Sequence, residues 1–287
     1  IRSLISALHV RDERRYTRKI VSSSYNRVVF TKEMKKDYPN NYRDMGGLAC
    51  PTNKTIKQGK LIRSASLFDL SEKGKKMLDD LHIDTVIDFR CAGETADKPD
   101  YIPKGSTYVH LPVFPDESYD LVTVSGDHTK RVLALKGDGI EEMRRQKYTV
   151  YTLMPFAKQT WEHLFSCMDK GETVLFHCSE GKDRTGMAAA VIEYCLGRTP
   201  EQIKEQYLLS NEYVKAHNRK TQILLRLMGK EKRLREVIAF CETVDMHQFH
   251  AAYTAALKNY RDIDDFLLQE YNITPERKAR WRSFYLQ

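Results

Sequence analysis

Residues 177–186 combine a nucleophile with groups that bind anions. Their sequence is His-Cys-Ser-Glu-Gly-Lys-Asp-Arg-Thr-Gly; an apolar, β-prone run precedes it at 173–176, and an alanine-rich apolar run follows at 187–196. The first run predicts a buried strand, and the second predicts a helix that ends at Gly197. The loop between them should lie at a helix N-terminus, where free backbone N–H groups and the helix dipole favour an anion.

Cys178 and Arg184 give this loop its predicted chemistry. A thiol at a helix N-terminus is shifted toward the thiolate, which is its reactive form. Arg184 presents a planar guanidinium that can hold two phosphate oxygens at once. Together they indicate nucleophilic displacement at phosphorus by cysteine. The simpler interpretation is a buried cysteine that happens to precede a helix. It suits most of the six cysteines of the chain but leaves the arginine unexplained.

The pattern H-C-x5-R-[ST] resembles the active-site loop of the cysteine-dependent phosphatases. Within it, Gly-Lys-Asp-Arg-Thr-Gly is similar to a bacterial tyrosine-phosphatase family whose members often also act on phosphoinositides. Further elements of that family are matched by NYRDMGG at 41–47, IRSASL at 62–67, IDFR at 87–90 and HLPV at 110–113. The similarity covers about residues 38–215.

The expected fold is α/β, a cysteine-phosphatase fold with a central, mainly parallel sheet flanked by helices and with additional C-terminal helices. Strands are predicted near 60–63, 85–89, 107–111 and 173–177, and their alternation with helices supports this class. Helix starts are predicted after Ser71, Thr199 and Thr274, each a good N-cap. Further helices are expected at about 155–169 and through 201–287.

Three parts of the chain are expected. Residues 1–37 form a basic, partly helical N-terminal extension, residues 38–215 form the phosphatase core, and residues 216–287 form a helical extension packed on that core. Residues 114–150 show no clear periodicity, and such a long connection is usually a functional loop, a lid or an unrecognised helix. We expect it to cover the cleft as a lid, together with helices after residue 210.

The resemblance assigns roles within the loop. Cys178 would attack phosphorus and form a phosphocysteine, while the N–H groups of 179–184 and the Arg184 guanidinium would hold the phosphoryl oxygens. Thr185 would donate a hydrogen bond to the sulfur, and His177 is expected to be a core histidine that organises the loop. The predicted phosphate-binding residues are Ser179, Glu180, Gly181, Lys182, Arg184 and Thr185.

The leaving group needs a proton, and two aspartates are candidates. Families with a Gly-Lys-Asp-Arg loop place an aspartate directly before the arginine, so the resemblance favours Asp183. The alternative is Asp116, because Phe114-Pro115-Asp116 resembles the separate acid loop of other tyrosine phosphatases. Asp183 could instead pair with a cation and shape the loop, and Asp116 could be an ordinary turn residue.

Other matched residues have less defined roles. Lys182 could meet an additional phosphate of an inositol ring, as in tensin-type lipid phosphatases, or it could only raise the local potential. Five residues are expected to be scaffold and to form a buried ion-pair set behind the loop: Arg43, Asp44, Arg63, Arg90 and Glu94.

The sequence therefore predicts a cysteine-dependent phosphomonoesterase that needs no cofactor and no metal. Expected substrates are phosphotyrosine proteins or phosphoinositides; the alternatives are a phytase-like inositol polyphosphate phosphatase and a catalytically silent phosphate-binding module. The net charge of +8 allows peripheral contact with an anionic membrane, although a solvated surface is the simpler interpretation. No nucleic-acid motif, transmembrane run or signal peptide is visible, so localisation stays open between cytoplasmic and secreted, and the oligomeric state is not indicated.

Overall fold

The computed structural model describes residues 37–50, 53–114 and 132–287. The expected N-terminal extension lies outside the described residues, apart from Asp37. Asp116 and residues 115–131 of the expected lid lie outside them as well.

A five-stranded sheet forms the centre of the molecule. Four strands run parallel in the order β2 (Leu61–Ser64), β5 (Val174–His177), β3 (Thr85–Asp88) and β4 (Thr107–His110). A two-residue strand, β1 (Arg43–Asp44), pairs antiparallel with β2 at the edge. Because the last residues of the parallel strands pair in one register, their carboxyl ends meet at one edge of the sheet. Ligands of open α/β sheets bind at that edge.

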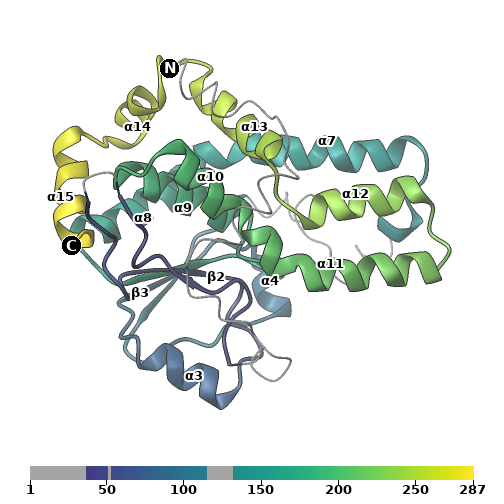
Figure 1. Cartoon of the computed structure of the whole chain (residues 1–287), viewed down its shortest axis with the longest axis horizontal. Coiled ribbons are helices and arrows are strands. Elements are labelled where there is room, and N and C mark those ends of the chain that lie inside the picture. Colours follow the sequence, from purple (N-terminus) through teal and green to yellow (C-terminus); the bar gives the residue numbers. More distant parts are fainter. Residues whose placement is uncertain (1–36, 51–52, 115–131) are drawn as a thin grey trace.

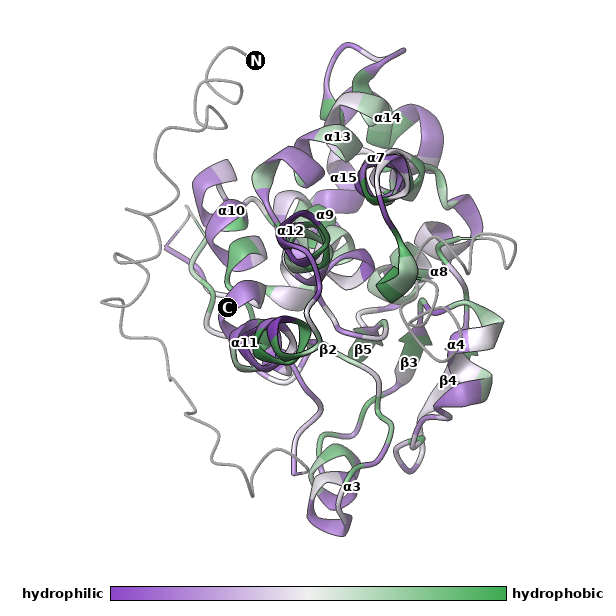
Figure 2. Cartoon of the chain, turned by 90° about the vertical axis from the view of Figure 1, so that its right-hand side faces the viewer, coloured by the Kyte–Doolittle hydropathy of each residue, from purple (hydrophilic) through white to green (hydrophobic). Residues whose placement is uncertain are grey.

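The two faces of the sheet are covered by different helices (Figure 1). Successive side chains of β5 alternate between them: Val174 and Phe176 belong to the large core cluster, and Leu175 belongs to a smaller one. The smaller cluster lies under α3 (Glu72–Asp79) and includes Leu78. Figure 2 shows β3 and β5 as apolar strands at the centre. The strand alternation therefore produces two apolar layers, as the predicted α/β class requires.

The remaining helices come mostly from the second half of the chain. Their bounds are α4 (Ala92–Asp97), α7 (Asp138–Leu153), a 3-10 turn (Met154–Phe156), α8 (Lys158–Lys170), α9 (Arg184–Cys195), α10 (Pro200–Leu208), α11 (Ser210–Leu227), α12 (Lys232–Glu242), α13 (Met246–Leu257), α14 (Ile263–Tyr271) and α15 (Pro275–Tyr285). None of these described helices combines the length and the apolar character that crossing a bilayer requires.

The predicted helix starts are confirmed. Thr199 accepts a hydrogen bond from the Gln202 amide at 3.3 Å, and the Gln202 side chain accepts one from the Thr199 amide at 2.9 Å, which forms a capping box. Ser71 and Thr274 also cap their helices. Gly171 ends α8 in the left-handed conformation.

Helices α7, α11 and α12 form a helical arm that extends away from the sheet (Figure 1). A separate apolar cluster holds the arm together: Val132, Ile140, Leu225, Leu234, Val237 and Ile238. Residues 138–150 of the segment with no clear periodicity therefore belong to a packed helix, α7, rather than to a loop.

The C-terminal helices share the main core. The fully buried Trp281 stacks on Phe165 of α8, with ring centroids 5.6 Å apart, and its Nε1 donates to Asp169 at 2.8 Å. The last residue, Gln287, donates from its amide to the Thr55 carbonyl at 2.9 Å. The predicted boundary between 215 and 216 falls within α11, and the division into core and extension remains a prediction.

Candidate active site

The candidate loop, residues 178–183, connects β5 to the first turn of α9 at the carboxyl edge of the sheet. Gly181 has φ +65°, and a Cβ atom there would lie 2.4 Å from the Ser64 carbonyl oxygen, so the position requires glycine. The Gly181 carbonyl accepts from Asn41 Nδ2 and from an Arg63 guanidinium nitrogen, each at 2.8 Å. These donors hold the loop from behind through its carbonyl oxygen.

The loop amides are available to an anion. None of the N–H groups of residues 179–184 donates a hydrogen bond to another described group. Unpaired amides at a helix N-terminus form an anion site through their partial positive charges and the helix dipole. The backbone therefore provides the site that the strand–loop–helix pattern predicted.

Cys178 is a buried thiol whose ionisation is favoured. Burial opposes the charged form, but Arg184 and the hydroxyl and amide of Thr185 outweigh it and hold the pKa of the Cys178 thiol below its ordinary value. The Thr185 Oγ1 atom is buried and has no other hydrogen-bond partner in the described part of the chain, which is consistent with its predicted role beside the sulfur. These contacts favour the thiolate form of Cys178, which is the reactive form of a cysteine.

Glu94 of α4 positions Arg184. Its two carboxylate oxygens accept from the two terminal guanidinium nitrogens at 2.6 and 2.9 Å, a bidentate pair. Burial opposes ionisation of Glu94, but Arg184 overcomes it and lowers the pKa of Glu94 to about 2. Glu94 also accepts from the Ser179 hydroxyl and from the Cys91 amide, so one carboxylate joins α4 to both ends of the loop.

Asp183 lies at the centre of a second charged network. Its Oδ1 atom accepts from Lys147 Nζ at 2.7 Å and from the Tyr151 hydroxyl at 2.5 Å, both on α7. Its Oδ2 atom is 3.1 Å from Lys182 Nζ. Burial opposes the charge, yet Lys147 and Lys182 hold the pKa of Asp183 well below its usual range. Asp183 is therefore an ionised carboxylate in this state, with Tyr151 in turn bonded to Tyr207 at 2.8 Å.

Lys182 is buried but lies between two carboxylates. Its ammonium pairs with Glu180 and with Asp183, and these acids outweigh burial and raise the pKa of Lys182. The Glu180 side chain is 44% exposed, so it can move away and leave the Lys182 ammonium to pair with another anion. Glu242, at the end of α12, also faces this group, and burial raises the pKa of Glu242 to about 7.

Comparison with known proteins shows the family to which the chain belongs. The family model described as "Tyrosine phosphatase family" matches residues 35–287. The chain belongs to the tyrosine phosphatase family. The match extends to the C-terminal residue, beyond the range of about 38–215 over which the motifs resemble that family.

Three relatives of this tyrosine phosphatase family member are similar over part of their length. A Cupriavidus necator protein that bears a tyrosine-protein phosphatase name is 31% identical over 61% of this chain and 62% of its own. The triple specificity protein phosphatase PtpB of Mycobacterium tuberculosis is 30% identical over 61% of this chain and 67% of its own. A tyrosine-protein phosphatase of Nostoc commune is 27% identical over 53% of this chain and 49% of its own. The matches therefore span between about half and two thirds of these relatives.

The family's IDFR element forms a buried scaffold behind the loop. Arg90 pairs with Asp88 at 2.7 Å and with Asp100 at 2.5 Å, and His177 Nε2 lies 3.2 Å from Asp100. Although burial opposes it, the two aspartates raise the pKa of His177. Two carboxylates and an imidazole could bind a metal ion, but the Arg90 guanidinium already occupies both carboxylates. The cluster therefore suits a structural ion-pair set.

Arg43 and Asp44, which also match family elements, form hydrogen bonds to backbone groups and no ion pairs with described residues. Arg43 donates to the Gln206 carbonyl at 2.7 Å, and Asp44 accepts from the amides of Gly46 and Gly59 at 2.8 and 2.7 Å. Of the predicted buried ion-pair set, only two residues form ion pairs: Arg90 with Asp88 and Asp100, and Glu94 with Arg184. Arg43, Asp44 and Arg63 instead support the loop and its neighbours by hydrogen bonds. That part of the expectation is corrected by the structure.

The structure brings the predicted loop residues together and adds three that the sequence analysis missed. Lys147, Tyr151 and Tyr207 surround Asp183 but carry no motif. The only signal was the four-residue spacing of Lys147 and Tyr151, which places two side chains on one face if residues 138–153 are a helix.

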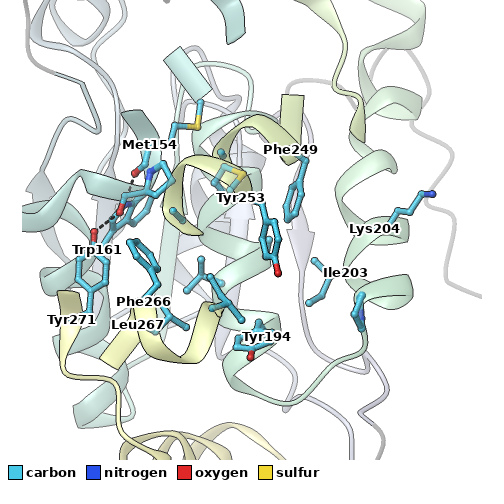
Figure 3. A pocket seen from close by; sticks show the side chains of 18 of the residues that line it. Met154, Trp161, Tyr194, Ile203, Lys204, Phe249, Tyr253, Phe266, Leu267 and Tyr271 are labelled. Carbon is cyan, nitrogen blue, oxygen red and sulfur yellow. Dashed lines mark hydrogen bonds between the residues drawn. The ribbon is translucent and has the colours of Figure 1, made fainter. Parts of the chain in front are cut away.

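Figure 3 shows a separate hollow that is lined by side chains of several helices. It has a volume of about 110 Å³ and lies between α8, α9, α10, α13 and α14, with a lining that is almost entirely apolar, such as Met187, Phe249 and Phe266. Almost no polar surface that could hold a phosphate faces this hollow. The hollow is therefore a poor candidate for the reaction site, in contrast to the loop at the N-terminus of α9.

Proposed function

We propose that this protein hydrolyses phosphomonoesters through a phosphocysteine intermediate, and that its substrates are phosphotyrosine proteins and phosphoinositides. The observation that carries the proposal is the free loop amides around Cys178, whose thiol pKa is lowered by Arg184 and Thr185. A thiolate in an anion-binding loop serves nucleophilic attack at phosphorus and has no evident structural use.

The reaction has two displacements. Cys178 Sγ attacks phosphorus, the ester oxygen leaves, and the loop amides with Arg184 stabilise the transferred phosphoryl group. Water then attacks the phosphocysteine, inorganic phosphate is released and the Cys178 thiolate is regenerated. Glu94 keeps the Arg184 guanidinium in a fixed plane, which reduces the reorganisation needed when the phosphoryl oxygens bind.

We propose Asp183 as the proton donor to the leaving group, provided that it is protonated when the substrate is bound. A carboxylate paired with Lys147 and Lys182 must gain a proton before it can act as an acid. A phosphate dianion in the loop would raise the pKa of Asp183 by like-charge repulsion and would compete for Lys182. Asp183 would then activate the water of the second step as a base. Asp116, outside the described residues, is the second candidate.

Lys182 supports the choice of phosphoinositides. Its partner Glu180 is half-exposed and can move away, which would leave the ammonium for a second phosphate group on an inositol ring. The triple specificity named for the Mycobacterium tuberculosis relative agrees with a broad substrate range here. A phosphotyrosine peptide, which has one phosphate, would gain less from Lys182.

The test is a phosphate-release panel with wild type and Cys178→Ser. Phosphotyrosine peptides, phosphoinositides and inositol polyphosphates are compared at matched concentration, with and without a chelator. We expect release by wild type from the first two classes, unchanged by the chelator, and none by Cys178→Ser, which should still bind inorganic phosphate. Residual activity within tenfold of wild type would remove Cys178 from the nucleophile role. Preference for inositol polyphosphates would indicate the phytase-like alternative, and no release from a folded protein would indicate a silent binding module.

A further inference from the structure

The free end of the helical arm exposes a group of large apolar side chains. In α11 and the residue after it, four such side chains lie in solvent: Ile223 (49% exposed), Leu224 (58%), Leu227 (81%) and Met228 (48%). The pairs 223/227 and 224/228 are four residues apart, so all four lie on adjoining positions of one helix face. Single exposed apolar residues need no explanation, but a contiguous group at the end of a projecting element marks an interaction site.

This face is not an unfilled part of the core. Leu225, between the exposed leucines, is 3% exposed and packs in the arm cluster with Leu234 and Val237. The buried residue fixes the rotation of α11, and that rotation points Leu224 and Leu227 outward. The arm therefore presents this face in a defined orientation. We call residues 219–235, which hold the apolar group and the turn between α11 and α12, the arm tip.

The arm tip is also the most basic part of the described chain. It contains seven Lys and Arg residues and one acid, Glu231, a net charge of +6 in a chain whose total is +8. Arg233 pairs with Glu141, and Lys232 pairs with Glu236. Among the described residues, no carboxylate forms an ion pair with Arg219, Lys220 or Arg226. Arg219 and Lys220 lie one turn before Ile223 and Leu224, so unpaired cations border the apolar face directly.

The other end of the same helices reaches the catalytic loop. Lys147, which binds Asp183, also donates to the Cys241 carbonyl of α12 at 3.4 Å. Glu242, the next residue, lies near enough to Glu180 to raise its own pKa further. Since α12 rises 1.5 Å per residue, the tip is about 15 Å from the loop along that helix. In Figure 2, the arm is seen from its free end.

We propose that the arm tip docks on an anionic lipid bilayer, with Leu224 and Leu227 entering the interface and Arg219, Lys220 and Arg226 contacting lipid headgroups. Aliphatic side chains bordered by unpaired cations match the apolar boundary and the negative surface of such a bilayer. A protein partner would more often be met by aromatic anchors and a balanced polar rim. The proposal deepens the proposed function, because docking would bring the loop to phosphoinositides in the same surface.

Binding is measured without substrate, by cosedimentation of the full chain with vesicles of phosphatidylcholine and phosphatidylserine at 7:3. We expect the wild type to partition onto these vesicles at least tenfold better than onto phosphatidylcholine alone, and to be released by high salt. Leu224→Gln/Leu227→Gln should lose at least tenfold in partitioning, and Arg219→Gln/Lys220→Gln should lose binding in a salt-dependent way. Leu268→Gln on α14, 39% exposed, and Lys76→Gln on α3 are the matched controls and should bind like wild type.

Turnover separates this proposal from the proposed function. With a soluble aryl phosphate, kcat/KM of Leu224→Gln/Leu227→Gln should stay within twofold of wild type, which also shows that the variant is folded. With phosphoinositide in vesicles its rate should fall at least tenfold. Equal vesicle binding by variant and wild type would overturn the proposal and assign any binding to other basic residues, such as those before residue 37. No vesicle binding by the wild type would also overturn it. Vesicle binding without any phosphate release would contradict only the proposed function.

Discussion

The ion pair between Lys147 and Asp183 gives the sharpest test of the acid assignment. Lys147→Met removes the opposite charge 2.7 Å from Asp183 Oδ1 while keeping most of the side-chain volume. Both side chains are largely buried, 14% and 18% exposed, so solvent screens the pair only weakly. Loss of the lysine should raise the pKa of Asp183, because the ionised carboxylate loses the strongest charge that stabilises it.

The size of the effect follows from what remains. Removing a neighbouring opposite charge shifts a carboxyl pKa by about one to three units. Lys182 still lies 3.1 Å from Asp183 Oδ2, and the Tyr151 hydroxyl still donates to Oδ1, so the lower end of about one unit is expected. A proton donor works below its pKa. Because Asp183 would be protonated only with the phosphate bound, the relevant profile is that of kcat, whose alkaline limb should move to higher pH by about one unit.

The assay compares two esters across pH. A poor leaving group such as an alkyl phosphate needs the proton, whereas an activated aryl phosphate does not. The shift should appear with the first ester and be small with the second. Arg145→Met, on the same helix but paired with Glu142 away from the loop, is the control and should leave both profiles unchanged. An equal shift with both esters, or none with either, would show that Asp183 shapes the loop and does not donate the proton.

Three further predictions follow from the same site. Thr185→Val should raise the pKa of Cys178 by removing the hydroxyl beside its sulfur. Iodoacetamide should therefore alkylate the variant several-fold more slowly at pH 6 but equally fast at high pH, where both thiols are ionised. Equal rates at pH 6 would show that the hydroxyl does not lower the thiol pKa. Glu94→Gln breaks the buried ion pair with Arg184 and should lower the free energy of unfolding by about 3–5 kcal/mol in urea titrations. A loss below about 1 kcal/mol would contradict a buried ion pair that stabilises the fold. Lys182→Met should reduce kcat/KM more for a phosphoinositide than for a phosphotyrosine peptide, and equal losses on both would reduce Lys182 to a general field effect.

The sequence was sufficient where the information is local. The strands at 85–88, 107–110 and 174–177 follow from apolar, β-prone runs, and the starts of α10 and α15 follow from threonine caps before proline. Helix α7 was not predicted, because it packs against both α12 and α13 and so has no single apolar face. Two-sided packing removes the periodicity on which prediction of an amphipathic helix depends.

The candidate loop could be predicted from the sequence itself, because the thiol, glycine and arginine that define it lie within seven consecutive residues between a strand and a helix. The partners of those residues were decided only by the tertiary structure. Glu94 meets Arg184 across 90 residues, and Lys147 meets Asp183 across 36. The sequence positions of Glu94 and Lys147 do not indicate these partners. The packing of α4 and α7 against the loop brings each pair together. That packing sets the charge state of Asp183, and therefore the condition under which it could act as an acid.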